Sequence, residues 1–479
     1  MKSVLNAFFS LMCAVACIGL NSCSENDTAA TSTVVPENVG EPYAEVLSEA
    51  NAKMLTPLLL RGDKSAKGYV YLQLKQATEG KLSVTFKVDE AALKAYNKTN
   101  GTSYAMYPAD KISLENDGAS EIVAGKKRSE TVAVTVSPGG VKGRTYAIPL
   151  SATVSDGEKD ITNNKIYMYL VTPQAEAPQI NVGRTVKNLC YIEVNRESML
   201  NAGEYVMKDS GEPFFDIASV FAANIRLNSD GEPYLSCNEQ TTFVLDHIGD
   251  LVRPLQAKGI KVHLSVLGDH TAAGMRSLTD DAADAFARQL KYYVDIYGFD
   301  GVDFDDEYST YSTDQATEPY IPSAAVMPDI ESCTPERYAH FVYACRQAMP
   351  DVNFGIYWYK GNDYPSGTVN GKAVNDLVDY AVYGLYGAWR AIDAETIAIE
   401  KQCPYAVSLT IGNENLHIDE PSLSRIKNEG WGYFAIYDLL GSRGFEEEFS
   451  RISRILYGQD VTWSGKLYDR TNFTPKTMR

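Results

Sequence analysis

The chain has 479 residues, of which 44% are hydrophobic and 22% charged, an ordinary composition for a globular protein of two or three domains. Its formal net charge of -18 argues against a nucleic-acid-binding protein, because such proteins depend on Lys and Arg to neutralise phosphates. The acidic balance is otherwise shared by many soluble proteins.

Residues 1–22 have the features of a secretory signal peptide. Lys2 supplies a positive charge, and residues 4–20 form an apolar run that is too short and too early for a membrane-spanning helix. The run ends in Leu20-Asn21-Ser22-Cys23, which resembles the lipobox of bacterial lipoproteins. The resemblance implies acylation of Cys23 and a lipid anchor in a Gram-negative outer membrane, at the cell surface or facing the periplasm. An ordinary secreted protein with a chance cysteine is the alternative.

Residues 23–42 are predicted to be a linker, because they are rich in Ser, Thr, Asn and Pro without periodicity. From 43 to 175, short segments alternate apolar and polar residues, and turn sequences separate them. This pattern predicts an all-β sandwich of immunoglobulin or fibronectin type with one helical insertion, EAALKAYNKTNG. The stretch around that insertion also resembles an N-terminal domain of glycan-utilisation lipoproteins, which implies a spacer or an accessory domain that binds carbohydrate.

Between 180 and 457 the spacing of apolar residues changes, after a predicted domain boundary at 172–183 that contains two prolines. Apolar strands alternate with helical patterns about every 35 residues. Helices are predicted at 243–259, ending in Gly259; at 279–298, with Thr279 as a cap and Gly298 at the end; and at 334–349, with Pro335 at the first helical position. Eight strands with crossover helices predict an α/β fold, a (β/α)8 TIM barrel, with a doubly wound sheet as the alternative. The predicted strands are 188–194, 216–225, 261–267, 301–306, 353–359, 380–386, 405–411 and 433–437. Residues 458–479 form a polar C-terminal extension without an assigned role.

The segment GFDGVDFDDEYS, residues 298–309, concentrates acids in an apolar strand. Because side chains alternate between the two faces of a strand, Asp303, Asp305 and Glu307 share one face, and Val302 and Phe304 share the other. We call these three acids the acidic ladder. In a barrel the ladder rises toward the carboxyl ends of the strands, where barrel active sites lie.

Neighbouring carboxyl groups in a closed site cannot all ionise cheaply, so the pKa of at least one rises. Such a group stays protonated near neutral pH, as general acid catalysis requires. A calcium site or a solvated acidic rim is the alternative. The spacing matches no EF-hand loop, and the interleaved Val302 and Phe304 indicate burial rather than a rim.

The motif DGVDFDDE at 300–307 resembles the DGxDxDxE signature of glycoside hydrolase family 18. Longer stretches are similar to the endo-β-N-acetylglucosaminidase branch of that family, the endoglycosidase H type: FAANIRLNSDGEPYLSCNEQT, KVHLSVLGDHTAAGM, FDGVDFDDEYSTY, YGLYGAW and GYFAIYDL. The resemblance covers about 184–457. It implies hydrolysis of the β-1,4 bond in the N,N'-diacetylchitobiose core of N-glycans or glycoproteins.

The resemblance also implies a mechanism in which the substrate supplies the nucleophile. Glu307 would protonate the glycosidic oxygen, and the substrate's 2-acetamido oxygen would close an oxazolinium ring on C1. Asp305 would hold the acetamido N–H, and Asp303 would share a proton with Asp305. Glu307 would then act as the base for water, which gives retention of configuration. Asp300 and Gly301 would be structural.

Substrate-binding roles follow from the same resemblance. Tyr386 and Tyr383 are placed where the family holds the acetamide carbonyl, and Tyr308 would line the same subsite. Trp389 and Trp358 are candidate sugar platforms, with packing around the barrel as the alternative for each.

Two positions depart from the family's pattern. Asp269 stands where Asn is expected, and Tyr383 stands where Asn or Gln is usual. Asp269 would also line the subsite, and its charge would raise the pKa of Glu307.

Two other functions remain open in the sequence. A chitinase is disfavoured because VFAANI and VLGDH depart from that branch and Tyr437 stands where chitinases commonly have Trp. A non-catalytic surface glycan-binding protein on the same scaffold is disfavoured because such proteins usually lose the acid, and Glu307 is retained. Other glycan-utilisation surface proteins are possible partners.

The cysteines and histidines predict no metal site and no cofactor. Five cysteines remain beyond Cys23, an odd and widely spaced set, and neither a CxxC nor an HxxxH spacing occurs.

Overall fold

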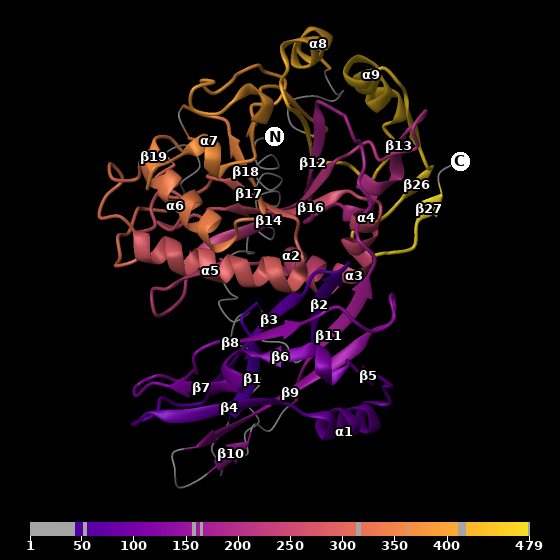
Figure 1. Cartoon of the computed structure of the whole chain (residues 1–479). Coiled ribbons are helices and arrows are strands. Elements are labelled where there is room, and N and C mark those ends of the chain that lie inside the picture. The colour runs from indigo at the N-terminus through magenta and orange to yellow at the C-terminus, as the bar shows by residue number, and fades with distance from the viewer. Residues whose placement is uncertain are drawn as a thin grey trace, which may run out of the picture.

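The computed structural model describes residues 44–50, 55–155, 160–162, 166–312, 318–361, 363–410 and 418–477. The predicted signal peptide, Cys23 and the linker lie outside the described residues. Figure 1 shows two parts, with the N-terminal strands in indigo and magenta below and the remaining elements, magenta to yellow, above. No helix in the described part of the chain is both long and apolar enough to cross a membrane.

Two sheets make up the N-terminal part, and alternating buried side chains from both enter its apolar core. One sheet has the order β1-β3-β8-β6 and the other the order β2-β11-β9-β4-β7, with β5 and β10 paired to β9. Their bounds are β1 Ala44–Ser48, β2 Leu55–Arg61, β3 Ala66–Leu74, β4 Leu82–Val88, β5 Ala105–Met106, β6 Ile112–Leu114, β7 Ala119–Ile122, β8 Val132–Val136, β9 Tyr146–Ser155, β10 Asp160–Thr162 and β11 Tyr167–Gln174.

The predicted helical insertion is α1, Glu90–Asn100. Asp89 caps its start by accepting a hydrogen bond from the backbone N–H of Ala92 at 3.0 Å. Gly101 ends it with a φ of 63°, a conformation that favours glycine.

A ten-stranded sheet forms the larger part, in the order β22-β21-β18-β17-β16-β14-β12-β24-β23 with β15 on β14. All pairs along this order are parallel. The bounds are β12 Lys187–Glu193, β14 Ile217–Leu227, β15 Pro233–Ser236, β16 Lys261–Leu267, β17 Gly301–Asp305, β18 Asn353–Trp358, β21 Tyr380–Tyr383, β22 Gln402–Cys403, β23 Ala406–Ser408 and β24 Tyr433–Tyr437.

The two end strands of this sheet are adjacent in the chain. Only Pro404 and Tyr405 separate β22 from β23, so the segment 402–408 pairs with β21 through its first half and with β24 through its second. The sheet therefore curls round to near closure.

The two faces of the curled sheet carry different side chains. Leu189, Tyr191, Tyr357, Tyr380 and other inward residues form one cluster inside the sheet. The alternate residues of the same strands belong to the much larger outer core beneath the helices.

Most strands are followed by helical segments. These are α2 Glu239–Asp246, α3 Ile248–Leu251, α4 Arg253–Ala257, α5 Asp280–Tyr297, α6 Pro335–Ala348, α7 Val374–Leu377, α8 Glu420–Glu429 and α9 Glu446–Tyr457. The single helix predicted near 243–259 is three short ones, with Pro254 at the start of the last. Thr279 occupies the cap position of α5 but its side chain makes no cap hydrogen bond, whereas Gly298 ends that helix as predicted.

The N-terminal sheets dock against α5 (Figure 1), and Arg61 of β2 reaches Asp300, the residue before β17. The Tyr69 hydroxyl donates to Asp295 Oδ2 at 2.6 Å, and Arg61 Nη1 lies 2.9 Å from Asp300 Oδ1. Leu59 fills the space beside Gly298, where a Cβ would lie 2.3 Å from its Cδ2.

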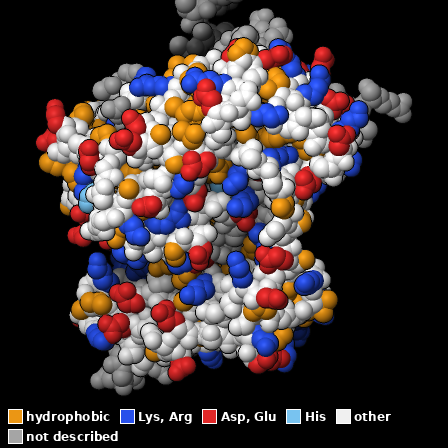
Figure 2. All heavy atoms as spheres, turned by 45° about the horizontal axis from the view of Figure 1, so that its top comes forward, with side chains coloured by type: hydrophobic (Ala, Val, Ile, Leu, Met, Phe, Trp, Pro, Cys, Tyr) orange, Lys and Arg blue, Asp and Glu red, His pale blue; other side chains and the backbone are white. Residues whose placement is uncertain are grey.

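The C-terminal extension is part of the folded structure. β25, Val461–Trp463, pairs antiparallel with β13, Tyr205–Met207, and β26, Lys466–Leu467, pairs with β27, Lys476–Thr477. Short helix turns complete the elements: η1 Ala109–Lys111, η2 Glu115–Gly118, η3 Met199–Glu204 and η4 Ile399–Lys401, with the hairpin β19 Thr368–Val369 and β20 Lys372–Ala373. On the face presented in Figure 2, acidic and basic side chains are interspersed.

Candidate active site

The acidic ladder lies inside the curled sheet, as its alternation predicts. Asp303 and Asp305 are 0% and 1% exposed on β17, and Glu307 follows just beyond the end of that strand. Val302 and Phe304 pack in the outer core. The ladder thus points inward and rises to the carboxyl end of the sheet.

Asp303, the deepest rung, is held by tyrosines from two other strands. The Tyr191 hydroxyl donates to Asp303 Oδ2 at 3.1 Å, and the Tyr380 hydroxyl lies 3.0 Å from His263 Nδ1 and also interacts with Asp303. Burial raises the pKa of Asp303 to about 6, against the lowering effect of the hydrogen bonds from Tyr380 and Tyr191. Burial also lowers the pKa of His263 to about 3, so its ring is neutral.

Asp305 and Glu307 form an interacting pair of carboxyl groups. Burial, and then the charges of Glu307 and Asp303, raise the pKa of Asp305 well above its ordinary value. Burial raises the pKa of Glu307 to about 7. Neither oxygen of Asp305 has a hydrogen-bond partner of ordinary geometry among the described residues, although both are buried. A buried carboxyl group whose acceptor atoms lack well-formed protein hydrogen bonds is suited to receive an N–H from a ligand.

Two tyrosines predicted to bind substrate lie beside this pair. Tyr386 stacks on Tyr437 at 5.2 Å, and burial raises its pKa well above the ordinary value, with added effects of Asp305 and Glu307. Burial, followed by the charge of Glu307, raises the pKa of Tyr308 to about 12. Both phenols are therefore neutral donors near the acids.

Tyr383 faces away from the ladder, which contradicts its predicted place in the subsite. It is three residues beyond Tyr380 on the same strand, so the two side chains lie on opposite faces. Tyr383 packs on Trp358 at 4.7 Å in the outer core, and Trp358 is 3% exposed. For Trp358, packing is therefore the alternative that the structure supports.

Trp389 also lies outside the sheet rather than at its mouth, so its predicted role as a sugar platform is wrong. Its ring meets Trp431 edge to face at 5.7 Å, and Arg425 of α8 lies 4.1 Å from its centroid. Trp431 precedes β24, which places this contact near the amino ends of the strands.

Asp269 pairs with Arg226, and their side chains are 21% and 38% exposed. The neighbouring main chain is fixed by Asn224, whose Nδ2 donates to the carbonyl of Gly268 at 2.7 Å. After burial, the effects on the pKa of Glu307 come from a hydrogen bond with Asp305 and from the charges of Asp306, Lys360 and Asp363, so the predicted influence of Asp269 is not among the main effects.

Asp300 and Gly301 lie at the amino end of β17, below the ladder. Asp300 Oδ2 accepts hydrogen bonds from Gln256 Nε2 at 2.7 Å and from the Val262 backbone N–H at 2.9 Å. A Cβ on Gly301 would lie 2.4 Å from His263 Nε2, so only glycine fits there. Neither residue approaches the upper rungs.

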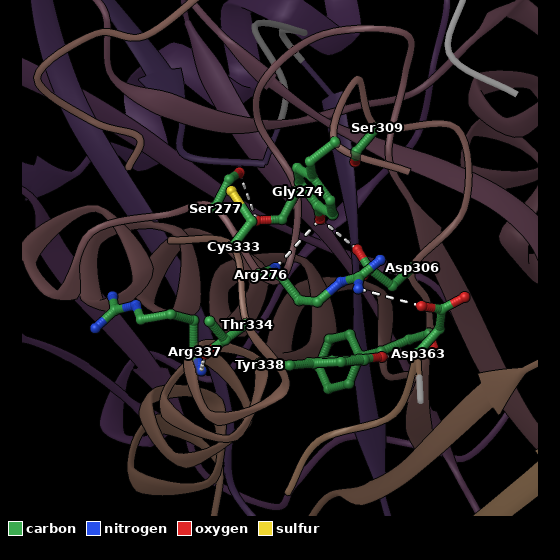
Figure 3. Close-up of polar contacts among 12 residues, drawn as sticks. Gly274, Arg276, Ser277, Asp306, Ser309, Cys333, Thr334, Arg337, Tyr338 and Asp363 are labelled. Carbon is green, nitrogen blue, oxygen red and sulfur yellow. Dashed lines mark hydrogen bonds and ion pairs between the residues drawn. The ribbon is translucent and has the colours of Figure 1, made fainter. Parts of the chain in front are cut away.

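Sequence reasoning missed the group around Asp306. Its side chain is 1% exposed and pairs with Arg276, which also lies 3.1 Å from Asp363 through Nη1. Figure 3 shows the Arg276 side chain between these two acids. An outward-facing buried acid requires a counter-charge, but the sequence does not locate a partner thirty residues away.

Within the described ranges, no cluster of three or more His, Cys, Asp or Glu side chains is arranged to hold a metal ion. The cysteines at 190, 237, 333, 345 and 403 are free thiols.

Sequence comparison identifies the class of protein. Endo-beta-N-acetylglucosaminidase F1 of Elizabethkingia meningoseptica is 30% identical over 310 residues, 63% of this chain and 87% of its own length. Endo-beta-N-acetylglucosaminidase of Flavobacterium sp. (strain SK1022) is 32% identical over 293 residues, 61% of this chain and 86% of its own. The chain therefore belongs to the endo-beta-N-acetylglucosaminidase family, whose members are glycoside hydrolases.

Solved structures extend the similarity to the N-terminal part. The crystal structure of Bacteroides thetaiotamicron EndoBT-3987 with Man5GlcNAc product has a TM-score of 0.55 and 26% identity, over 90% of this chain and 99% of that one. The same protein in complex with Man9GlcNAc2Asn substrate gives a TM-score of 0.54 at 23% identity. A family model described as an N-terminal domain matches residues 43–159.

Proposed function

We propose that this protein is an endo-β-N-acetylglucosaminidase that hydrolyses the β-1,4 bond of the N,N'-diacetylchitobiose core of N-glycans. The observation that carries the proposal is the buried pair at the top of the ladder: Glu307, with a pKa of about 7, interacts with Asp305, whose two buried oxygens make no hydrogen bond of ordinary geometry with the described residues. The relatives bear the name of this activity, and the similar structure holds an N-glycan substrate.

The proposed mechanism is that of glycoside hydrolase family 18, in which the substrate supplies the nucleophile. Protonated Glu307 donates its proton to the glycosidic oxygen as the bond to C1 breaks. The 2-acetamido oxygen attacks C1 and forms an oxazolinium ring, while Asp305 accepts a hydrogen bond from the acetamido N–H. Glu307, now ionised, takes a proton from water as the water opens the ring, and the configuration at C1 is retained.

Asp303 and the nearby phenols have supporting roles in this proposal. Asp303, with a pKa of about 6, shares a proton with Asp305. Tyr386 and Tyr308, neutral donors beside the acids, hold the acetamide oxygen and line the subsite.

The wider organisation is also a proposal. We infer that residues 180–457 form a (β/α)8 barrel, supported by the near closure through 402–408, and that 43–175 form an immunoglobulin-like sandwich that acts as an accessory domain. The sequence features at 1–23 support a lipoprotein signal with acylation at Cys23, and hence an outer-membrane anchor.

The test uses a glycoprotein with high-mannose chains, one with complex chains, and chitin oligomers. Mass spectrometry of the wild-type reactions is expected to show a single N-acetylglucosamine left on asparagine. Glu307→Gln is expected to lower the rate by roughly 10²–10⁴. Cleavage of chitin alone would contradict the substrate assignment, and binding without any product would favour a glycan-binding protein.

A further inference from the structure

The main chain around Glu307 is fastened to the loop that follows β16. The carbonyl of Glu307 accepts a hydrogen bond from the Gly268 N–H at 3.1 Å, and the carbonyl of Tyr308 accepts one from the His270 N–H at 2.9 Å. A Cβ on Gly268 would lie 2.5 Å from the Glu307 carbonyl oxygen, so this contact depends on glycine. The position of Glu307 therefore depends on how that loop is held.

Arg276 holds the same loop to two others. Its Nε pairs with Asp306, the residue before Glu307, and its Nη1 lies 3.1 Å from Asp363 Oδ1 (Figure 3). The Tyr311 hydroxyl donates to Asp306 Oδ1 and accepts a hydrogen bond from the Arg276 N–H at 3.2 Å. The guanidinium also lies 5.0 Å from the centre of the Tyr311 ring.

These contacts connect three segments at the carboxyl ends of neighbouring strands: Arg276 after β16, Asp306 after β17 and Asp363 after β18. The Arg276 side chain is 11% exposed and that of Asp306 is 1% exposed, so water screens this pair weakly. A planar guanidinium can bind two carboxylates in fixed directions, which a lysine cannot.

We propose that Arg276 is a positioning residue for the reaction, which bridges Asp306 and Asp363 and thereby fixes Glu307 and balances the negative charges around it. This inference rests on the proposed function. The ion pairs of Arg276 are with Asp306 and Asp363, so it acts through these two carboxylate partners rather than on the substrate.

The charges around Glu307 determine what each change does. Asp306 and Asp363 raise its pKa and Lys360 lowers it, after the larger effects of burial and of Asp305. The titratable groups that interact electrostatically with Glu307 are Asp305, Asp306, Tyr308, Tyr357, Lys360, Asp363 and Tyr386. Arg276 neutralises two members of this set.

The experiment measures kcat/KM against pH for the full chain on an N-glycosylated peptide. Asp363→Asn removes a charge that raises the pKa of Glu307, so the alkaline limb is expected to move to lower pH by about 0.5 unit or more. Arg276→Met leaves the charges of Asp306 and Asp363 uncompensated, so the alkaline limb of the pH profile is expected to move to higher pH. Arg276→Lys keeps the charge but loses the two-way bridge, so the limb should stay while kcat falls roughly 10-fold or more.

Glu448→Gln is the matched control, because Glu448 and Asp363 are each 25% exposed and paired with an arginine. It is expected to leave both the limb and kcat unchanged. If Arg276→Met does not fold, the result for Asp363→Asn decides the proposal. The fold should tolerate that substitution, because the Asp363 side chain is partly exposed. An unchanged alkaline limb in folded Asp363→Asn would overturn the proposal about Arg276. If the wild type is active in the same experiment, the proposed function still stands. An inactive wild type would instead reject the proposed function.

Discussion

Glu307 is the residue on which the chemistry depends, because its pKa sets when it can donate a proton. Burial raises that pKa to about 7. We therefore expect kcat/KM to fall on the alkaline side with a midpoint near pH 7, measured on a glycopeptide across pH 5 to 9, a range chosen to span the pKa by about two units on either side. Since Glu307 and Asp305 interact, the midpoint belongs to the pair. Activity that stays constant to pH 9 would contradict the assignment of Glu307 as the acid.

The raised pKa also predicts how stability depends on pH. The carboxyl of Glu307 ionises near 4.5 in the unfolded chain and near 7 in the folded one, so ionisation favours unfolding between these values. Glu307→Gln lacks this effect. Its free energy of unfolding should exceed that of the wild type by on the order of 1–3 kcal/mol above pH 7, and the difference should vanish below pH 4.5. Denaturant unfolding at several pH values measures it, and a difference independent of pH would contradict the prediction.

For individual residues, strand alternation and the acidic motif were enough to predict that Asp303, Asp305 and Glu307 lie in the interior. The same alternation places Tyr380 and Tyr383 on opposite faces of their strand, with Tyr383 outside. The prediction that Tyr383 lines the subsite came from the family resemblance instead. Asp306 was overlooked because its partner Arg276 comes from another loop, and loop contacts do not follow a sequence period.

Among the strands, β18 approaches β17 closely at Gly355, where the side chain of Asp303 leaves no room for a Cβ. A Cβ on Gly355 would lie 2.2 Å from Tyr380 Cζ and 2.3 Å from Asp303 Oδ2. Gly355→Ala should therefore displace Asp303, lower kcat, and reduce the free energy of unfolding by about 1–3 kcal/mol. Chemical denaturation and a glycopeptide assay measure both effects.

Gly249→Ala is the control for this change, because nothing lies within 4 Å of a Cβ at that position in α3. It should leave activity unchanged. Equal effects of the two substitutions would show that close packing at Gly355 is not the cause.

The sequence predicted the long elements better than the short ones. α5 and α6 begin and end close to their predicted positions, since Gly298 and Pro335 are strong helix signals. The segment 243–259 lies in three short helices rather than one, and within the strand predicted at 405–411 the described strand is β23, Ala406–Ser408. Pro254, at the start of α4, accounts for the last of the helix breaks, because proline lacks the backbone N–H that a continuous helix needs.

At the scale of the whole molecule, the N-terminal sheets contact the strand that carries the ladder at its opposite end. Arg61 pairs with Asp300 at 2.9 Å, with side chains 18% and 19% exposed. Arg61→Met should lower the free energy of unfolding by about 1–3 kcal/mol, because Asp300 keeps its charge without this partner. Arg454→Met, which breaks an exposed pair with Asp460, should cost about 0–1 kcal/mol. Equal losses in both variants would contradict a stabilising role for this interface.

The division into a strand-rich N-terminal part and a strand–helix C-terminal part was visible in the sequence, because the apolar rhythm changes near 175. How the parts dock was not visible, since Arg61 and Asp300 are far apart in the chain and both are ordinary charged residues. For the same reason the pairing of β25 with β13 could not be predicted from the polar tail.

The most direct test of the account is the configuration of the first product. Proton NMR during early cleavage of a high-mannose glycopeptide reports the anomer of the released oligosaccharide before it equilibrates. Attack by the substrate's own acetamide, between Asp305 and Glu307, predicts that the β anomer appears first. Early appearance of the α anomer would mean direct attack by water, and would contradict the roles proposed for the acidic ladder.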